Sequence, residues 1–135
     1  MKKKNWYLPF MAICLGLSSC REEVKEDIRY EINSVKIDSV EITTPQMTVG
    51  EFQTIYLYST YEKSCNSFGK VDYVKVPNSL ERKVAIAVMK DLQKECGPLH
   101  TFRHQFNFEA KTPGTYTFRF WNGGDNWIEK NIVVN

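Results

Sequence analysis

Two cysteines and two histidines between residues 65 and 104 are the side chains best suited to chemistry. Cys65 or Cys96 could act as a thiol nucleophile with His100 or His104 as its base, or the two cysteines could form a disulfide. Histidines four residues apart bind zinc when they lie on a helix. Which chemistry applies depends on the structure of residues 100–109 and on the compartment that the protein occupies.

Residues 100–109 alternate in the manner of a β-strand, which argues against a metal site. One face of this strand would carry His100, Phe102, His104, Phe106 and Phe108, and the other would carry polar residues. On a strand the two histidines lie about 13 Å apart, too far to share one ion. We therefore predict no metal and no other cofactor, with both histidines at the edge of the core.

The amino terminus has the layout of a secretory signal peptide. Lys2-Lys3-Lys4 precede an apolar run from Trp6 to Leu17 that contains no charge. This run is shorter than the roughly 20 residues that a membrane-spanning helix needs. Small residues follow it, and Cys20 stands directly behind them. The sequence therefore predicts export.

Leu17-Ser18-Ser19-Cys20 resembles the lipobox of bacterial lipoproteins. The resemblance implies a signal peptide over residues 1–19, a diacylglycerol on the Cys20 thiol, and an acyl chain such as palmitate on the new amino group. Several acyl chains anchor a protein stably, whereas one alone does not. Some lipoproteins have an aspartate after the lipidated cysteine that retains them in the inner membrane. This chain has Arg21 at that position, which implies that it is attached to the outer membrane. Glu22-Glu23 resembles an export signal, so the periplasmic and cell-surface faces both stay open, as does a plain secretory signal with a chance cysteine.

Export favours a disulfide between Cys65 and Cys96. Cys14 leaves with the signal peptide and Cys20 is the lipid site, so these two cysteines remain as a pair in an oxidising compartment. Their bridge would close a loop of about thirty residues, which the chain-entropy relation values at about 3–4 kcal/mol. A thiol nucleophile fits such a compartment poorly.

Charge and composition exclude a nucleic-acid partner. The chain has 18 basic and 16 acidic residues, and removing the three signal lysines leaves 15 against 16, a net charge of −1. A nearly neutral domain offers no large positive field to nucleic acid. Aromatic residues make up 13% of the chain, a content that suits β-structure.

The mature chain is long enough for one domain. Residues 20–33 are charged and predict a lipidated amino terminus with a flexible tether, followed by a single domain over residues 34–135. A change of face near Asp38-Ser39 predicts a bulge within the first strand. Residues 82–92 fit a helix or a strand, and we favour a strand because strands flank them. The expected strands are 35–43, 51–61, 70–76, 82–92, 100–109, 115–122 and 127–134.

The segment from Thr112 to Phe118 identifies the fold class. Pro113-Gly114 makes a corner, and Tyr116 follows it two residues before the core position Phe118. This arrangement resembles the tyrosine corner of immunoglobulin-like β-sandwiches, with a phenylalanine where antibody domains have a cysteine. Together with the lipobox, the tether and the cysteine pair, it resembles the small immunoglobulin-like lipoproteins of Gram-negative bacteria. That resemblance implies no functional residue beyond Cys20.

Two functions from different classes fit this sequence. A non-enzymatic module would bind a glycan, a peptide or an envelope protein through aromatic residues outside the core alternation, namely Tyr56, Tyr58, Trp121 and Trp127. Cross-strand pairs that merely stabilise the sheet are the simpler interpretation of these four residues. The alternative is a small enzyme with a carboxylate-based site, although no catalytic motif is present. A pocket with converging polar groups would favour the enzyme, and a flat aromatic patch would favour binding.

Overall fold

Residues 29–135, the part of the chain that the computed structural model describes, form nine β-strands. The predicted signal peptide, Cys20 and most of the predicted tether lie outside the described residues. The strands are β1 (Tyr30–Val35), β2 (Ser39–Ile42), β3 (Gln46–Met47), β4 (Phe52–Glu62), β5 (Asn66–Lys75), β6 (Glu81–Asp91), β7 (Leu99–Glu109), β8 (Gly114–Trp121) and β9 (Trp127–Val134). Within this part, no helix is long and apolar enough to cross a membrane.

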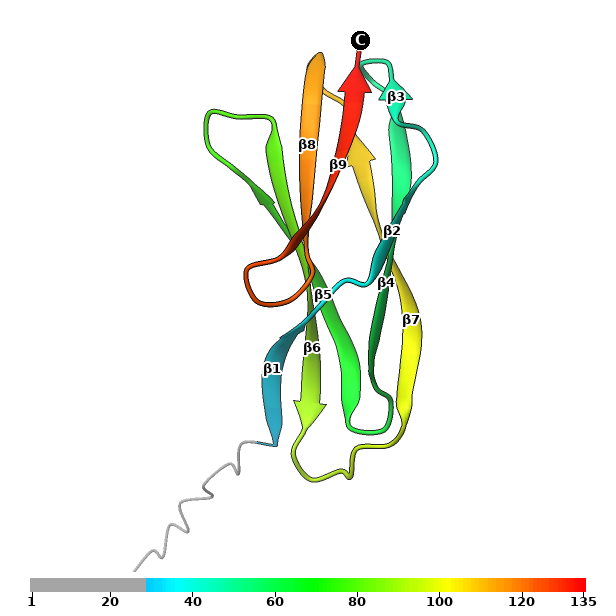
Figure 1. Ribbon diagram of the computed structural model, residues 1–135, viewed down its shortest axis with the longest axis vertical. Coiled ribbons are helices and arrows are strands. Elements are labelled where there is room, and N and C mark those ends of the chain that lie inside the picture. Colours follow the sequence, from blue (N-terminus) through cyan, green and yellow to red (C-terminus); the bar gives the residue numbers. More distant parts are fainter. Residues whose placement is uncertain (1–28) are drawn as a thin grey trace, which may run out of the picture.

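The strands form two sheets that pack face to face as a β-sandwich (Figure 1). The larger sheet has the order β1-β6-β8-β9-β3, with β5 also paired to β6, and the smaller sheet has the order β2-β4-β7. The predicted all-β sandwich is confirmed, with nine strands in place of about seven. Two pairings in the larger sheet, β6 with β8 and β3 with β9, are parallel, whereas the sheets of immunoglobulin domains are antiparallel.

Residues 82–92 form a strand, as predicted, and the helical alternative is wrong. β6 is the centre of the larger sheet, because β5 pairs along one of its edges while β1 and β8 share the other. Val84, Ile86 and Val88 point into the core and are at most 1% exposed. β-Branched residues at alternate positions suit such a buried central strand.

The change of face near Asp38 is a crossing between sheets, and the predicted single bulged strand is wrong. β1 pairs with β6 in the larger sheet, and β2 pairs with β4 in the smaller one. Between them, the Ile37 amide donates to the Trp121 carbonyl at 2.8 Å and the Asp38 amide donates to the Tyr58 carbonyl at 2.7 Å. Ile37 is fully buried at the crossing. The apolar residues shift from odd to even positions here, because the direction of the core differs between the two sheets.

The largest differences from the predicted strands concern β1, β5 and β3. β1 begins at Tyr30, so the domain starts four residues before the predicted position 34, with exposed residues held by backbone pairing to β6. β5 begins at Asn66, four residues before the predicted strand start at residue 70. The two-residue β3 pairs in parallel with the last strand, β9, and is too short to show an alternation.

Side chains from both inner faces meet in one core. Ile55 and Leu57 of the smaller sheet and Ile86, Phe118 and Ile132 of the larger sheet are fully buried. Aromatic contacts join the layers: the ring of Phe118 lies 5.0 Å from that of Phe108, edge to face. The inward positions predicted from the alternation of β8 are therefore core positions.

The tyrosine corner is present at the entry to β8. The Tyr116 hydroxyl donates to the backbone carbonyl of Thr112 at 2.9 Å and lies 2.8 Å from the Thr112 hydroxyl. Gly114 has a φ of 139°, a conformation that glycine adopts readily. The buried phenol thus ties the strand to the corner that precedes it.

Tyr116→Phe should lower the free energy of unfolding by about 1 kcal/mol, because it removes one buried hydrogen bond without changing the packed ring. Urea denaturation of the two proteins measures this difference. Tyr58→Phe is the matched control, since its hydroxyl bonds to Glu41 at an exposed position. Equal stability of Tyr116→Phe and the wild type would show that the corner does not depend on the hydroxyl.

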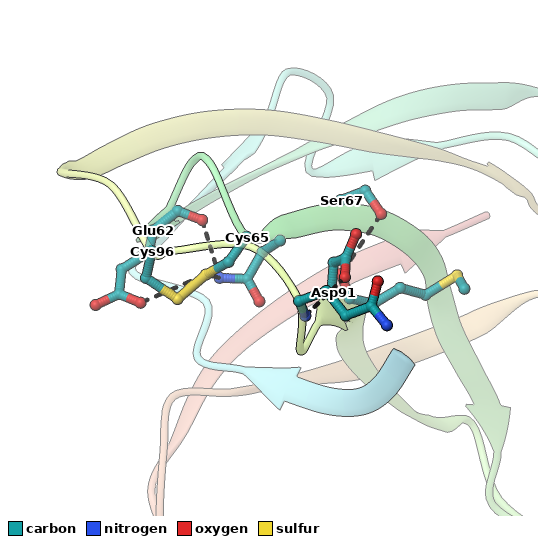
Figure 2. The surroundings of a disulfide bond; sticks show 8 residues. Glu62, Cys65, Ser67, Asp91 and Cys96 are labelled. Carbon is teal, nitrogen blue, oxygen red and sulfur yellow. Dashed lines mark hydrogen bonds between the residues drawn. A yellow bond between two sulfur atoms is a disulfide. The ribbon is translucent and has the colours of Figure 1, made fainter. Parts of the chain in front are cut away.

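The predicted disulfide between Cys65 and Cys96 is confirmed (Figure 2). Its Cα atoms are 4.7 Å apart, and 31 positions separate the two residues in the sequence. The bond joins the turn between β4 and β5 to the segment between β6 and β7. Because both sulfurs are bonded to each other, neither can act as a thiol nucleophile.

Candidate functional site

The four aromatic residues predicted as a binding surface form two separate pairs. Tyr56 and Tyr58 lie on the outer face of the smaller sheet, because their neighbours Ile55 and Leu57 point inward. Trp121 and Trp127 lie at directly opposed positions of β8 and β9 in the larger sheet, on its outer face. The outer faces of a sandwich point in opposite directions, so the four residues do not make one surface.

Both pairs are occupied by contacts within their own sheet. The Tyr58 hydroxyl donates to Glu41 at 3.0 Å, and the Arg103 guanidinium lies 4.9 Å from the ring centre of Tyr56. The Trp121 indole donates to the Gly124 carbonyl at 2.9 Å. Two cations, Lys83 and Arg119, lie 5.6 and 5.9 Å from the ring centre of Trp127. These contacts favour the simpler interpretation, in which the aromatic pairs stabilise the sheets.

A polar pocket lies at one end of the sandwich, between the two sheets. Its volume is about 390 Å³, within the range of ligand sites. Strands β5, β6 and β8 supply one wall, while the end of β7 and the corner after it supply the other. We call it the Arg82 pocket; it is lined by Tyr73, Lys75, Arg82, Asn107, Phe108, Glu109, Lys111, Thr112 and Tyr116.

Arg82 is the central charge of this pocket. It is only 9% exposed, because it occupies an inward position of β6, in phase with Val84 and Ile86. Its Nη1 donates to the carbonyls of Ser79 at 3.2 Å and Glu81 at 3.0 Å, whereas its Nε is buried without a hydrogen-bond partner.

No carboxylate of the described residues forms a salt bridge with Arg82. The guanidinium instead lies 5.2 Å from the ring centre of Tyr116. Buried charges in proteins are usually paired, because removing an ion from water is costly. An unpaired buried arginine beside a pocket is therefore an exception that requires an explanation.

The other charges around the pocket add to its positive potential. Lys75 and Lys111 are exposed at the rim, and Glu109 is the only carboxylate among the lining residues. Burial raises the pKa of the Tyr73 phenol, although the nearby charge of Arg82 and a hydrogen bond with its guanidinium partly offset that rise. Tyr73 is thus a neutral hydroxyl that can donate a hydrogen bond inside the pocket.

The pocket brings together cations, phenols and one carboxylate. Its lining residues include neither a histidine nor a cysteine, and its single carboxylate has no second carboxylate beside it. Cysteine–histidine and carboxylate pairs are therefore absent from this pocket, whereas a lone carboxylate, a tyrosine or a lysine can also serve in general acid–base catalysis. Cations and phenols are also groups that hold an anion.

His100 lies near the opposite end of the sandwich and His104 lies midway along β7, and both contact other aromatic rings. The His104 ring stacks on Phe68 at 4.3 Å, and its Nε2 lies 3.0 Å from the Tyr61 hydroxyl. Burial lowers the pKa of His104. Near the stack, Glu62 lies close to Cys65 and Cys96, but the disulfide leaves no thiolate there to bind a metal.

Sequence reasoning missed Arg82, although a signal was present. The alternation that predicts Val84, Ile86 and Val88 as inward residues also places position 82 on the inner face. A charged residue in phase with buried ones is the pattern that could have identified it. Comparison of the chain with protein-family models, curated proteins and solved structures finds no match.

Proposed function

We propose that this protein is a lipid-anchored, non-enzymatic binding module of the bacterial cell envelope, attached to the outer membrane through Cys20. Its partner would be a glycan, a peptide or another envelope protein, and the Arg82 pocket would be its binding site. One observation carries the proposal: the pocket and the point at which the chain enters the domain lie at opposite ends of the sandwich.

The separation of the two ends follows from the register of β6. Tyr30, the first residue of β1, pairs with Asp91 at the end of β6, whereas Arg82 lies near the start of that strand. Nine residues of strand span about 30 Å. β1 accordingly begins at the lower end of Figure 1, and β6 runs down to meet it. A domain anchored through its amino terminus could thus present the pocket away from the membrane.

Apolar side chains at the entry end support this orientation. Nine large hydrophobic residues are exposed within residues 29–135, and the six at this end are Tyr30, Ile32, Phe68, Met89, Leu92 and Leu99. Ile32 and Met89 are direct partners across β1 and β6. Exposed apolar patches mark surfaces that meet a partner or a lipid interface. This end would face the membrane, with residues 21–29 as the link to Cys20.

Cys20→Ala should abolish lipidation and release the protein from the membrane fraction. Metabolic labelling with a palmitate analogue, followed by fractionation of the cells, measures both effects. Cys14→Ala is the matched control, because this cysteine lies inside the proposed signal peptide and its loss should leave labelling and anchoring unchanged. Membrane-anchored Cys20→Ala protein would contradict the proposal.

A second measurement distinguishes the two faces of the outer membrane. Protease treatment of intact cells should remove the domain if it lies on the cell surface. Protection until the outer membrane is permeabilised would place it in the periplasm, where its partners would be peptidoglycan or envelope proteins.

A further inference from the structure

We propose that the Arg82 pocket recognises a carboxylate group of its ligand, with the Arg82 guanidinium as the main contact. This inference rests on the proposed function as a binding module and names the chemistry that the module would bind.

The first argument is the charge of Arg82. Arg82 is more than nine-tenths buried, yet none of the salt bridges in the described residues involves it. Its two backbone hydrogen bonds both leave from Nη1, and Nε has no partner. A carboxylate entering the pocket would supply the missing counter-charge, and Arg–carboxylate bonds are among the stronger hydrogen bonds in proteins.

The second argument is the set of neutral donors around that charge. The Asn107 side chain lies on the outer face of the smaller sheet, where its Oδ1 accepts a hydrogen bond from Thr54. Inside the pocket, Tyr73 and Thr112 supply a phenol and a hydroxyl. These groups can hold the second carboxylate oxygen and neighbouring polar atoms of the ligand. The Tyr73 and Tyr116 rings add apolar wall, so the pocket combines a fixed cation, neutral donors and aromatic surface, as small-molecule sites do.

The third argument selects a single negative charge over a doubly charged group. Arg82 is the only buried cation of the pocket, because Lys75 and Lys111 are exposed at the rim, where water screens them. Glu109, also at the pocket, would repel a second negative charge. A monovalent carboxylate therefore fits better than a phosphate dianion.

A purely structural role does not account for Arg82. Its contacts with the Ser79 and Glu81 carbonyls, with the Tyr116 ring and with the Tyr73 hydroxyl supply no negative charge. An apolar side chain at this inward position would avoid burying an unpaired charge.

The test is a calorimetric titration of the full-length protein in detergent with glucuronate and, in parallel, with neutral glucose. These two probes differ at the carboxylate, so we expect heat of binding for glucuronate and none for glucose. N-Acetylglycine, sulfate and phosphate are the further arms. Binding of N-acetylglycine alone would assign the carboxylate to a peptide rather than to an acidic sugar, with the role of Arg82 unchanged.

Variants locate the binding in the pocket. Arg82→Gln should weaken glucuronate binding by roughly tenfold or more, the loss expected for one charged hydrogen bond. Lys75→Gln and Lys111→Gln should each weaken it by up to about fivefold, as expected for exposed charges. Lys63→Gln, an exposed lysine at the opposite end of the sandwich, should leave the affinity unchanged. If Arg82→Gln fails to fold, the glucuronate affinities of Lys75→Gln and Lys111→Gln test whether the ligand binds in the pocket.

Three results would overturn the inference. The first is that neither carboxylate probe binds to a folded, lipidated protein, and the second is that glucose binds as tightly as glucuronate. The third is that sulfate and phosphate bind as tightly as the carboxylates. Unchanged affinity in both rim variants and in any folded Arg82→Gln protein would also overturn it. Each result leaves the membrane anchoring of the proposed function intact, because the Cys20→Ala fractionation tests that separately.

Discussion

Phe118→Ala should lower the free energy of unfolding by about 3–5 kcal/mol, the range for truncating a buried aromatic residue. Phe118 is fully buried. The centre of its ring lies 5.0 Å from the ring centre of Phe108, 6.1 Å from that of Phe120, 6.4 Å from that of Phe106 and 6.5 Å from that of Tyr73. These neighbours come from both sheets, so no single strand can move to fill the cavity.

Urea denaturation of the full-length protein measures this loss. Phe52→Ala is the matched control, because Phe52 is 72% exposed and its truncation should change stability by no more than about 0.5 kcal/mol. If the two variants were equally stable, the aromatic cluster around Phe118 would not be the contact that joins the sheets.

The size of the expected effect reflects the position of Phe118. Antibody domains have a cysteine of the inter-sheet disulfide two residues after the corner tyrosine. Here a phenylalanine occupies that position, and its contacts with Phe106 and Phe108 of β7 link the sheets without a covalent bond. The disulfide of this protein lies at the end of the sandwich instead.

The face that each residue occupies could be predicted from the sequence, because it depends on a local period of two. Phe118 occupies a core position as predicted, and the residues at alternate positions beside it, Tyr116 and Phe120, also point inward. Val84, Ile86 and Val88 alternate in the same way and are buried. The pairing of the strands could not be predicted in this way. Alternation does not show that β6 lies beside β8, or that the chain changes sheets at Asp38, since both depend on contacts between distant residues.

The same limit applies to the candidate site. Alternation correctly put Tyr56, Tyr58, Trp121 and Trp127 outside the core, but it could not show that they belong to two different sheets. The Arg82 pocket combines residues of four strands and the corner, so its walls depend on the packing of the sheets. Only the inward position of Arg82 could be predicted from the alternation of the residues next to it in the sequence.

Removing the disulfide with Cys65→Ala/Cys96→Ala should lower the free energy of unfolding by about 3–4 kcal/mol. The bond closes a loop with a sequence separation of 31, and opening it increases the conformational entropy of the unfolded chain. Cys65 is also 2% exposed, and its carbonyl accepts a 2.7 Å hydrogen bond from the Asp91 amide (Figure 2). Asp91 pairs with Tyr30, so the bond stiffens the end of the sandwich at which the chain enters.

Denaturation with and without reductant tests the mechanism and supplies its own control. Reductant should destabilise the wild type by about the same amount as the double substitution and should leave the double variant unchanged, because that variant has no disulfide to lose. A wild-type transition that does not respond to reductant would show that the bond does not constrain the unfolded chain. A larger loss in the double variant than in the reduced wild type would measure the packing contribution of the two sulfurs, which reduction leaves in place.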